Sequence, residues 1–369
     1  MPKRAQVLGR RALNRTLLER QMLLCRRRIA VLDVVERLVG LQAQVPRDPY
    51  VALWSRLDRF HPETLAEPIA DRRAVRMGLL RATLHLVTAR DALTLRSVID
   101  PVIQRTLHTQ SPFGRRLVGL DVEELKAIAT ELLEERPRTR AELGPLLAER
   151  WPAHDAASLS YAVTYLLPLV QVTPRGIWGQ TGPSAFTTVE LWLGRPMGRE
   201  TAPDDLIRRY LAVFGPSTPA DVQSWSGLQA MREVLERLRS GLRTFRDERG
   251  RELFDVPGAP LPDPDTPSPV RFLPEYDNVL LGHADRSRIV SPETKLWAEI
   301  GWGTVLVDGF TAARWKLERE KDAATLRIEP FGKLSRADRA ETADEGARLI
   351  AFLAEDSTSH DVRFSGLRN

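Results

Sequence analysis

The chain has 369 residues, of which 43% are hydrophobic and 28% charged, a balance that excludes a disordered or fibrous protein and leaves room for several compact domains. The 54 lysines and arginines against 49 aspartates and glutamates give a net charge of +5, the sign that a nucleic-acid partner requires. No run approaches the roughly 18 apolar residues of a membrane span, no apolar leader opens the chain and Cys25 is the only cysteine, so we expect a cytoplasmic protein without membrane contact or internal disulfides.

A unit of three helices followed by short strands organises most of the chain, and we predict that it occurs three times. The first copy occupies residues 1–115, with helices predicted at 11–24, 31–40 and 48–58 from the spacing of apolar residues. Residues 79–88 then alternate between apolar and polar side chains, which predicts a strand.

The second copy occupies residues 116–200. Apolar spacing predicts three helices, at 121–135, 139–150 and 157–168. Residues 169–173 and 177–178 flank a Pro-Arg-Gly sequence at 174–176, which is typical of a hairpin turn.

The third copy occupies residues 201–258 and carries the clearest signals. Helices are predicted at 204–214, 219–227 and 230–240, and Thr218 is suited to cap the second of them because a proline and an acidic residue follow it. Two strands, 242–245 and 252–256, bracket a polar turn. Three helices and a hairpin are the layout of a winged helix, whose third helix can enter a DNA groove.

The remaining residues, 259–369, differ in kind. Six prolines in residues 257–269 predict an extended linker. The strands predicted after it are 270–273, 278–281, 287–290, 303–308, 311–319 and 324–329. A closing helix at 336–354 and a returning strand at 362–364 complete a β-rich module.

Three stretches carry a resemblance to a known family. They read LQAQVPRDPY at 41–50, FGPSTPAD at 214–221, and LPEYDN at 273–278 with HADRSR at 283–288. The chain resembles the winged-helix DNA glycosylases of the AlkZ and YcaQ type, and its Gln-x-Gln sequence resembles the AlkZ branch, since other members carry Gln-x-Asp. The resemblance implies an α+β fold with tandem winged helices in a C-shaped arrangement around duplex DNA, with Gln42 and Gln44 as catalytic residues.

The activity implied by this resemblance is hydrolysis of the N-glycosidic bond of N7-alkylated purines, including bulky adducts and interstrand crosslinks made by antibiotic alkylators. The partner is then duplex DNA that contains alkylated purines. The sequence contains no metal-ligand cluster, no phosphate-binding glycine loop and no recognisable lysine–aspartate pair of a lyase. We therefore expect a monofunctional enzyme that is a monomer and uses no metal or small-molecule cofactor.

The residues themselves explain how two glutamines could suffice. Pro46 biases the chain before it toward extended geometry, in which Gln42 and Gln44 point the same way and Ala43 points toward the core. Glutamine cannot act as a general base, but an N7-alkylated purine is cationic and leaves as a neutral base. Carbonyl oxygens that hold a water near C1′ are then sufficient. The alternative is that the pair only caps helix ends or binds neighbouring backbone.

Basic residues outside the glutamine pair are candidates for DNA contact. His283, Arg286 and Arg288 lie in a turn-like segment, Arg175 lies in the predicted hairpin of the second copy, and Arg47 follows the glutamines. An aspartate–arginine pair that braces the loop is the alternative for the 283–288 segment.

Two other functions fit the same fold. Winged helices mostly bind DNA without altering it, so a transcription regulator is the first alternative. A noncatalytic resistance protein that covers adducts is the second. Release of free modified base would separate both from a glycosylase.

Overall fold

The computed structural model describes residues 6–292, 294 and 301–366. The fold is mixed α+β, and its described strands form sheets of six, three and five strands. None of the described helices is long and apolar enough to cross a bilayer.

The first unit begins with the three predicted helices, each shorter than expected: α1 (Arg10–Arg20), α2 (Val31–Arg37) and α3 (Asp48–Arg56). Helix α4 (Glu63–Ala70) and strand β3 (Ala74–Gly78) were not predicted. The strand predicted at 79–88 is only half right. A 3-10 turn, η1 (Leu80–Ala82), precedes β4 (Leu84–Thr88), because Arg81 and Ala82 adopt left-handed backbone angles with φ of 55° and 56°.

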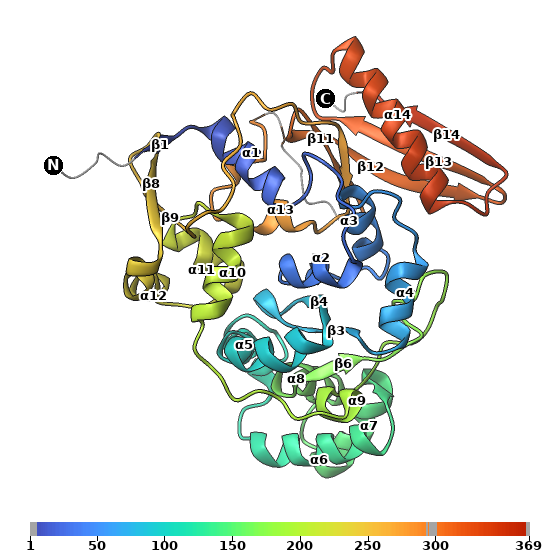
Figure 1. Cartoon of the computed structure of the whole chain (residues 1–369). Coiled ribbons are helices and arrows are strands. Elements are labelled where there is room, and N and C mark those ends of the chain that lie inside the picture. The colour runs from blue at the N-terminus through green and yellow to red at the C-terminus, as the bar shows by residue number, and fades with distance from the viewer. Residues whose placement is uncertain (1–5, 293, 295–300, 367–369) are drawn as a thin grey trace.

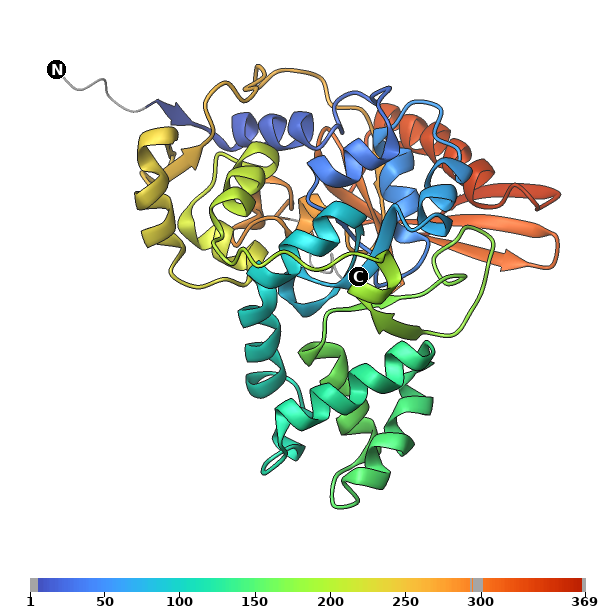
Figure 2. The ribbon, with the colours of Figure 1, turned by 60° about the horizontal axis from the view of Figure 1, so that its bottom comes forward.

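Helix α5 (Ala89–Thr109) follows β4 directly and was also missed. The hydroxyl of Thr88 accepts a hydrogen bond from the backbone N–H of Asp91, so the last residue of the strand is also the helix cap. The helix leads into a lobe made by α6 (Val122–Glu135), α7 (Arg140–Arg150) and α8 (Ala156–Leu166). This lobe projects from the rest of the molecule (Figure 2).

The predicted hairpin at 174–176 is wrong. Strand β6 (Leu169–Gln171) pairs antiparallel with β7 (Ala185–Thr188), so the two strands are joined by the long loop 172–184 rather than by a tight turn at 174–176. Helix α9 (Val189–Leu193) follows. The six-stranded sheet has the order β2-β4-β3-β6-β7-β5, with β2 (Leu41–Gln42) at one edge and β5 (Arg138–Thr139) at the other. The β3–β6 pairing therefore joins the first two units through one sheet.

The third unit follows the prediction closely. It contains α10 (Asp204–Phe214), α11 (Pro219–Ser226), α12 (Met231–Leu238) and the hairpin of β8 (Arg243–Asp247) and β9 (Glu252–Asp255). Thr218 caps α11 through a reciprocal capping box with Asp221. The one addition is β1 (Val7–Leu8), which pairs in parallel with β8 near the N-terminus (Figure 1).

The C-terminal module is a five-stranded sheet with α14 (Arg336–Leu353) packed against it (Figure 1). Its strands, in sheet order, are β10 (Arg271–Leu273), β11 (Gly303–Val307), β12 (Phe310–Glu320), β13 (Ala323–Pro330) and β14 (Ser359–Phe364). Asp308 and Gly309 both have positive φ and form the predicted β11–β12 turn.

Two strands predicted in this module are wrong. Residues 278–281 form helix α13 (Asn278–Leu281). Residues 287 and 288 belong to a 3-10 turn, η4 (Arg286–Arg288), and residues 289–290 continue as a turn and bend. In both cases an aspartate caps the turn, because Asp277 accepts from the N–H of Val279 and Asp285 accepts from the N–H of Ser287. These side-chain caps outweigh the apolar alternation that favoured a strand.

Candidate active site

Gln42 is the last residue of β2, at the edge of the six-stranded sheet. It lies opposite His85 in the antiparallel β2–β4 pair, and the N–H of Ala43 continues the ladder by donating to the carbonyl of Leu84. Ala43 is fully buried, Gln42 is 7% exposed and Gln44 is exposed. The extended backbone expected from Pro46 is therefore present up to Ala43, and the alanine points into the core as expected.

The carboxamide of Gln42 is held by a cation. The Nη2 of Arg81 donates to Gln42 Oε1 at 3.0 Å, and its Nη1 donates to the carbonyl of Trp225, at the end of α11, at 2.9 Å. Burial and the nearby charge of Arg286 lower the pKa of Arg81 to about 10, so the guanidinium is protonated at neutral pH. No local sequence pattern predicts this contact, because it depends on the left-handed backbone at Arg81.

Gln44 differs from Gln42 in its surroundings. Its side chain is exposed, and among the described residues no hydrogen bond engages its carboxamide. Gln44 therefore has both its carbonyl oxygen and its amide available for a water or for DNA.

His85 shares the face of the sheet that carries Gln42. Its Nδ1 lies 3.0 Å from the carbonyl oxygen of Thr83, which can only accept, so Nδ1 carries the proton and Nε2 is an acceptor. Burial and the charge of Arg81 lower the pKa of His85 to about 3, so the ring is neutral at physiological pH.

Two buried side chains fix the backbone on either side of Gln42. Arg76, on β3, donates to the carbonyl of Ala43 at 2.6 Å. Asn278, on α13, donates to the carbonyl of Gly40 at 2.9 Å. Hydrogen bonds therefore hold the backbone of residues 40–43 against both the sheet and the C-terminal part of the chain. They fix the backbone position from which the Gln42 side chain extends.

Asp48 is a residue that sequence reasoning passed over. It begins α3, four positions after Gln44, and is only 6% exposed. Its Oδ2 is buried, and no group in the described part of the chain forms a hydrogen bond with it. Burial, together with the charges of Glu275 and Asp277, raises the pKa of Asp48 to about 7. A carboxyl group with a strongly shifted pKa marks a candidate functional residue. The sequence alone could not show the shift of Asp48, because burial in the fold causes it.

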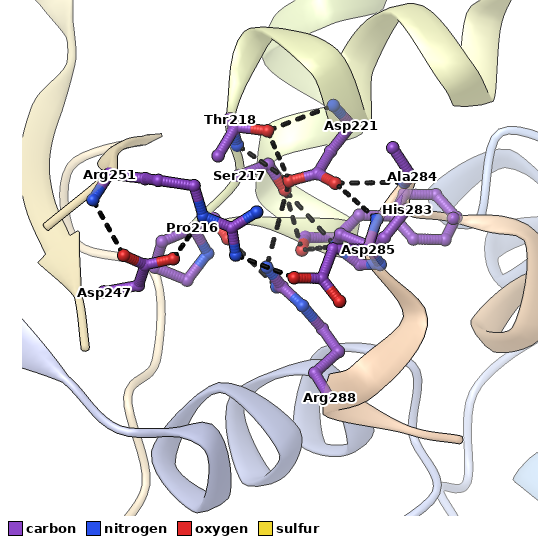
Figure 3. Close-up of polar contacts among 12 residues, drawn as sticks. Pro216, Ser217, Thr218, Asp221, Asp247, Arg251, His283, Ala284, Asp285 and Arg288 are labelled. Atoms are coloured by element: carbon purple, nitrogen blue, oxygen red, sulfur yellow. Dashed lines mark hydrogen bonds and ion pairs between the residues drawn. The ribbon is translucent and has the colours of Figure 1, made fainter. Parts of the chain in front are cut away.

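The structure does not place His283 and Arg288 where DNA contact was expected. They are 1% and 6% exposed and lie in a buried polar network around Asp221 (Figure 3). His283 Nε2 lies 2.9 Å from the carbonyl oxygen of Phe214, and Arg288 donates to the carbonyl of Pro216 at 3.0 Å. Both side chains brace the turn between α10 and α11, and neither can reach a phosphate in this arrangement.

The aspartate–arginine brace considered from the sequence exists, but its arginines come from elsewhere. Asp285 accepts from Arg251 at 2.8 Å and from Arg249 at 3.2 Å, so the loop is tied to the β8–β9 hairpin. Arg286 is partly exposed and lies close enough to Arg81 to lower its pKa. Arg286 is therefore the member of this segment that lies near Arg81, the hydrogen-bond partner of Gln42.

The other two predicted DNA contacts, Arg47 and Arg175, form no hydrogen bond with Gln42 or Gln44 among the described residues. Arg47 is exposed directly before α3 and lines a surface cleft of about 660 Å³ together with Trp178 and Arg319. Arg175 is partly buried in the loop between β6 and β7 and donates to the carbonyl of Gly182 at 3.1 Å.

Within the described residues, Gln42, Gln44 and Arg81 offer two carboxamides and a guanidinium, groups that can bind and orient a reacting group but cannot serve as a general base. The family model of the AlkZ-like DNA glycosylases matches residues 35–352, and the chain belongs to this family. It is therefore a DNA glycosylase, a hydrolase that acts on N-glycosyl bonds.

Individual relatives agree with this assignment. The interstrand DNA cross-link repair glycosylase of Streptomyces sahachiroi is 25% identical over 380 residues, which cover 95% of each chain. Among solved structures, the DNA glycosylase AlkZ of Streptomyces sahachiroi matches with a TM-score of 0.71 at 21% identity, covering 98% of this chain and 100% of that one. The structural likeness shows that the two share a fold.

Proposed function

We propose that this glycosylase excises N7-alkylated purines from duplex DNA, including bulky adducts and interstrand crosslinks, and leaves an abasic site. The observation that carries the proposal is the Gln42–Gln44 pair at a sheet edge, with one carboxamide anchored and the other exposed. The relative from Streptomyces sahachiroi supports the crosslink substrate, because its name describes repair of interstrand crosslinks.

The chemistry follows from the charge of the substrate. An N7-alkylated purine carries a positive charge that weakens its glycosidic bond, so it departs as a neutral base without receiving a proton. The enzyme then needs to hold a water near C1′ and to place partial negative charge beside the developing oxocarbenium ion. Gln44 can provide a carbonyl oxygen for the water. Gln42, whose carboxamide is held by Arg81, would give the site a fixed polar group beside that water.

We further propose that residues 1–115, 116–200 and 201–258 act as three winged-helix units that curve around the duplex, with residues 259–369 as the β-rich module. Arg286, Arg47 and Arg175 would contact phosphates. Enzymes that flip a base into a closed pocket reject crosslinked bases, which cannot leave the stack. An open, curved surface would accept them.

The test is release of free base from a panel of duplexes that carry 7-methylguanine, a bulkier N7-guanine adduct or an N7 interstrand crosslink. We expect free modified base, detected by chromatography, from the wild type and from Gln110→Ala, a control at an exposed glutamine at the end of α5. We expect none from unmodified duplex. Tight duplex binding without release from any substrate would favour a regulator or an adduct-covering protein instead.

A further inference from the structure

Arg81 has an unusual position for a partly buried cation. Its two hydrogen bonds are with uncharged oxygens, Gln42 Oε1 and the carbonyl of Trp225, and within the described residues no carboxylate pairs with it. Removing a charge from water without an opposite charge beside it is costly, and its retention calls for an explanation.

The backbone that presents Arg81 is also costly. Arg81 and Ala82 both have left-handed φ values, 55° and 56°, in a segment that carries no glycine. Non-glycine residues in this region are strained and persist where the surrounding structure holds them, often at functional sites. In this backbone conformation the guanidinium of Arg81 reaches the carboxamide of Gln42.

The contact determines which end of the Gln42 carboxamide faces which way. A guanidinium has five N–H donors and no acceptor, so it can bind only the carbonyl end of a carboxamide. Gln42 therefore has its Oε1 toward Arg81 and its Nε2 away from it. Without Arg81, the carboxamide would be able to rotate between its two orientations.

We propose that Arg81 is a positioning residue of the glycosylase site: it locks the carboxamide of Gln42 in one orientation, and base release depends on that lock. The inference rests on the proposed function of Gln42 and assigns Arg81 no contact with the substrate. It differs from a purely structural role, because a structural tie would affect folding without a specific effect on the rate of base release.

The chain offers a matched control for the contact to α11. Arg105, on α5, donates to the carbonyl of Gly227, at the same end of α11 that Arg81 reaches through Trp225. Among the described residues Arg105 has no contact with Gln42. Arg105→Met removes a comparable arginine–carbonyl bond at this helix end, and Arg81→Met removes the bond and the lock together.

The experiment compares the wild type, Arg81→Met, Arg81→Lys and Arg105→Met. The rate of base release is measured in single turnover with enzyme saturating over a 7-methylguanine duplex, alongside duplex affinity and melting temperature. We expect Arg81→Met to release base on the order of 100-fold more slowly, the loss typical of a misplaced catalytic group, with duplex affinity within about twofold. Arg105→Met should retain the wild-type rate.

A double substitution separates action through Gln42 from any other effect. The shorter side chain in Gln42→Asn cannot reach the guanidinium, so adding Arg81→Met to it should slow the reaction little further, whereas two independent effects would multiply. Arg81→Lys keeps the charge but cannot bind both Gln42 and Trp225 with a single nitrogen in the same geometry, and we expect an intermediate rate. Should Arg81→Met fail to fold, Arg81→Lys and its double variant carry the same comparison.

The outcomes are distinct. A wild-type rate in Arg81→Met would overturn the inference, and so would a variant whose only defect is weaker duplex binding. If the wild type and Arg105→Met release no base, the proposed function is what fails. A slow Arg81→Met beside an active Arg105→Met, with non-additivity toward Gln42→Asn, supports the positioning role.

Discussion

Gln42 and His85 are direct cross-strand partners in the antiparallel β2–β4 pair, so a neutral imidazole lies on the same sheet face as a candidate catalytic carboxamide. With its Nδ1 bound to the carbonyl of Thr83, His85 can offer only an acceptor, and its low pKa makes it a weak base. His85 is therefore poorly suited to act as a general base beside Gln42.

The burial of His85 makes stability depend on pH. Its pKa is about 3 in the fold against 6.5 in an unfolded chain, so between these values the unfolded chain binds a proton that the folded one does not. Stability should fall as pH drops below 6.5, by up to about 1.4 kcal/mol per pH unit for this group. Melting temperatures from pH 7 to pH 5 should fall less steeply in His85→Gln; parallel curves would contradict the assignment.

Asp48 should have the opposite dependence. Its pKa is about 7 in the fold against 3.8 unfolded, so the folded chain holds a proton that the unfolded one loses, and stability falls as pH rises from about 4 to 7. Asp48→Asn cannot ionise. The melting temperature of this variant relative to the wild type should rise between pH 5 and pH 8. A constant difference across that range would show that Asp48 is ionised in the fold.

The carboxylate of Asp277 has two structural roles: it pairs with Arg56 and it caps α13. It accepts from Arg56 at 2.7 and 2.8 Å in a fully buried pair, and it caps α13, which positions Asn278 against Gly40. Asp277→Ala leaves the Arg56 charge buried and unpaired, so we expect a loss of about 3–5 kcal/mol in the free energy of unfolding. Asp356→Ala, which breaks an exposed pair with Arg319, should cost far less than Asp277→Ala. Equal losses in urea denaturation would argue against the burial of the Asp277 pair.

Substitutions at Arg286 and Arg288 should distinguish an effect on DNA binding from an effect on folding. Arg286 is partly exposed near Arg81, and we expect Arg286→Ala to weaken duplex affinity and to lower the slope of log affinity against log salt by about 1. Arg288 is buried against Pro216, so Arg288→Ala should lower the melting temperature instead. Filter binding at several salt concentrations distinguishes the two, and an unchanged slope in Arg286→Ala would exclude a phosphate contact there.

Local signals predicted much of the fold. The Thr218 cap, the Asp308–Gly309 turn and the helices of the second and third units all follow from residues within a few positions of one another. The errors arose where a side chain overrode the local pattern. Asp277 and Asp285 converted two predicted strands into turns, and the strand β4 passes directly into α5 at Thr88.

The candidate site, like the fold, was predictable only where it depends on residues close together in the sequence. The backbone is extended at Gln42 because β2 pairs with β4, whereas the chain bends at Gln44 and Val45, directly before Pro46, where extension was predicted. The partners of Gln42 come from positions 81 and 85, and their contacts depend on sheet pairing and on a strained turn. Burial separated Arg288 from Arg286, two arginines that are equivalent in the sequence. Contacts between residues far apart in the sequence cannot be predicted from the residues next to them.

The central claim is that two carboxamides suffice for hydrolysis because the alkylated purine is ready to leave. Release of 7-methylguanine from duplex DNA by Gln42→Ala and Gln44→Ala, measured against the wild type at saturating enzyme, tests it most directly. We predict that each substitution abolishes release, a loss on the order of 100-fold or more, while duplex affinity is largely retained. Wild-type rates in both variants would contradict the account.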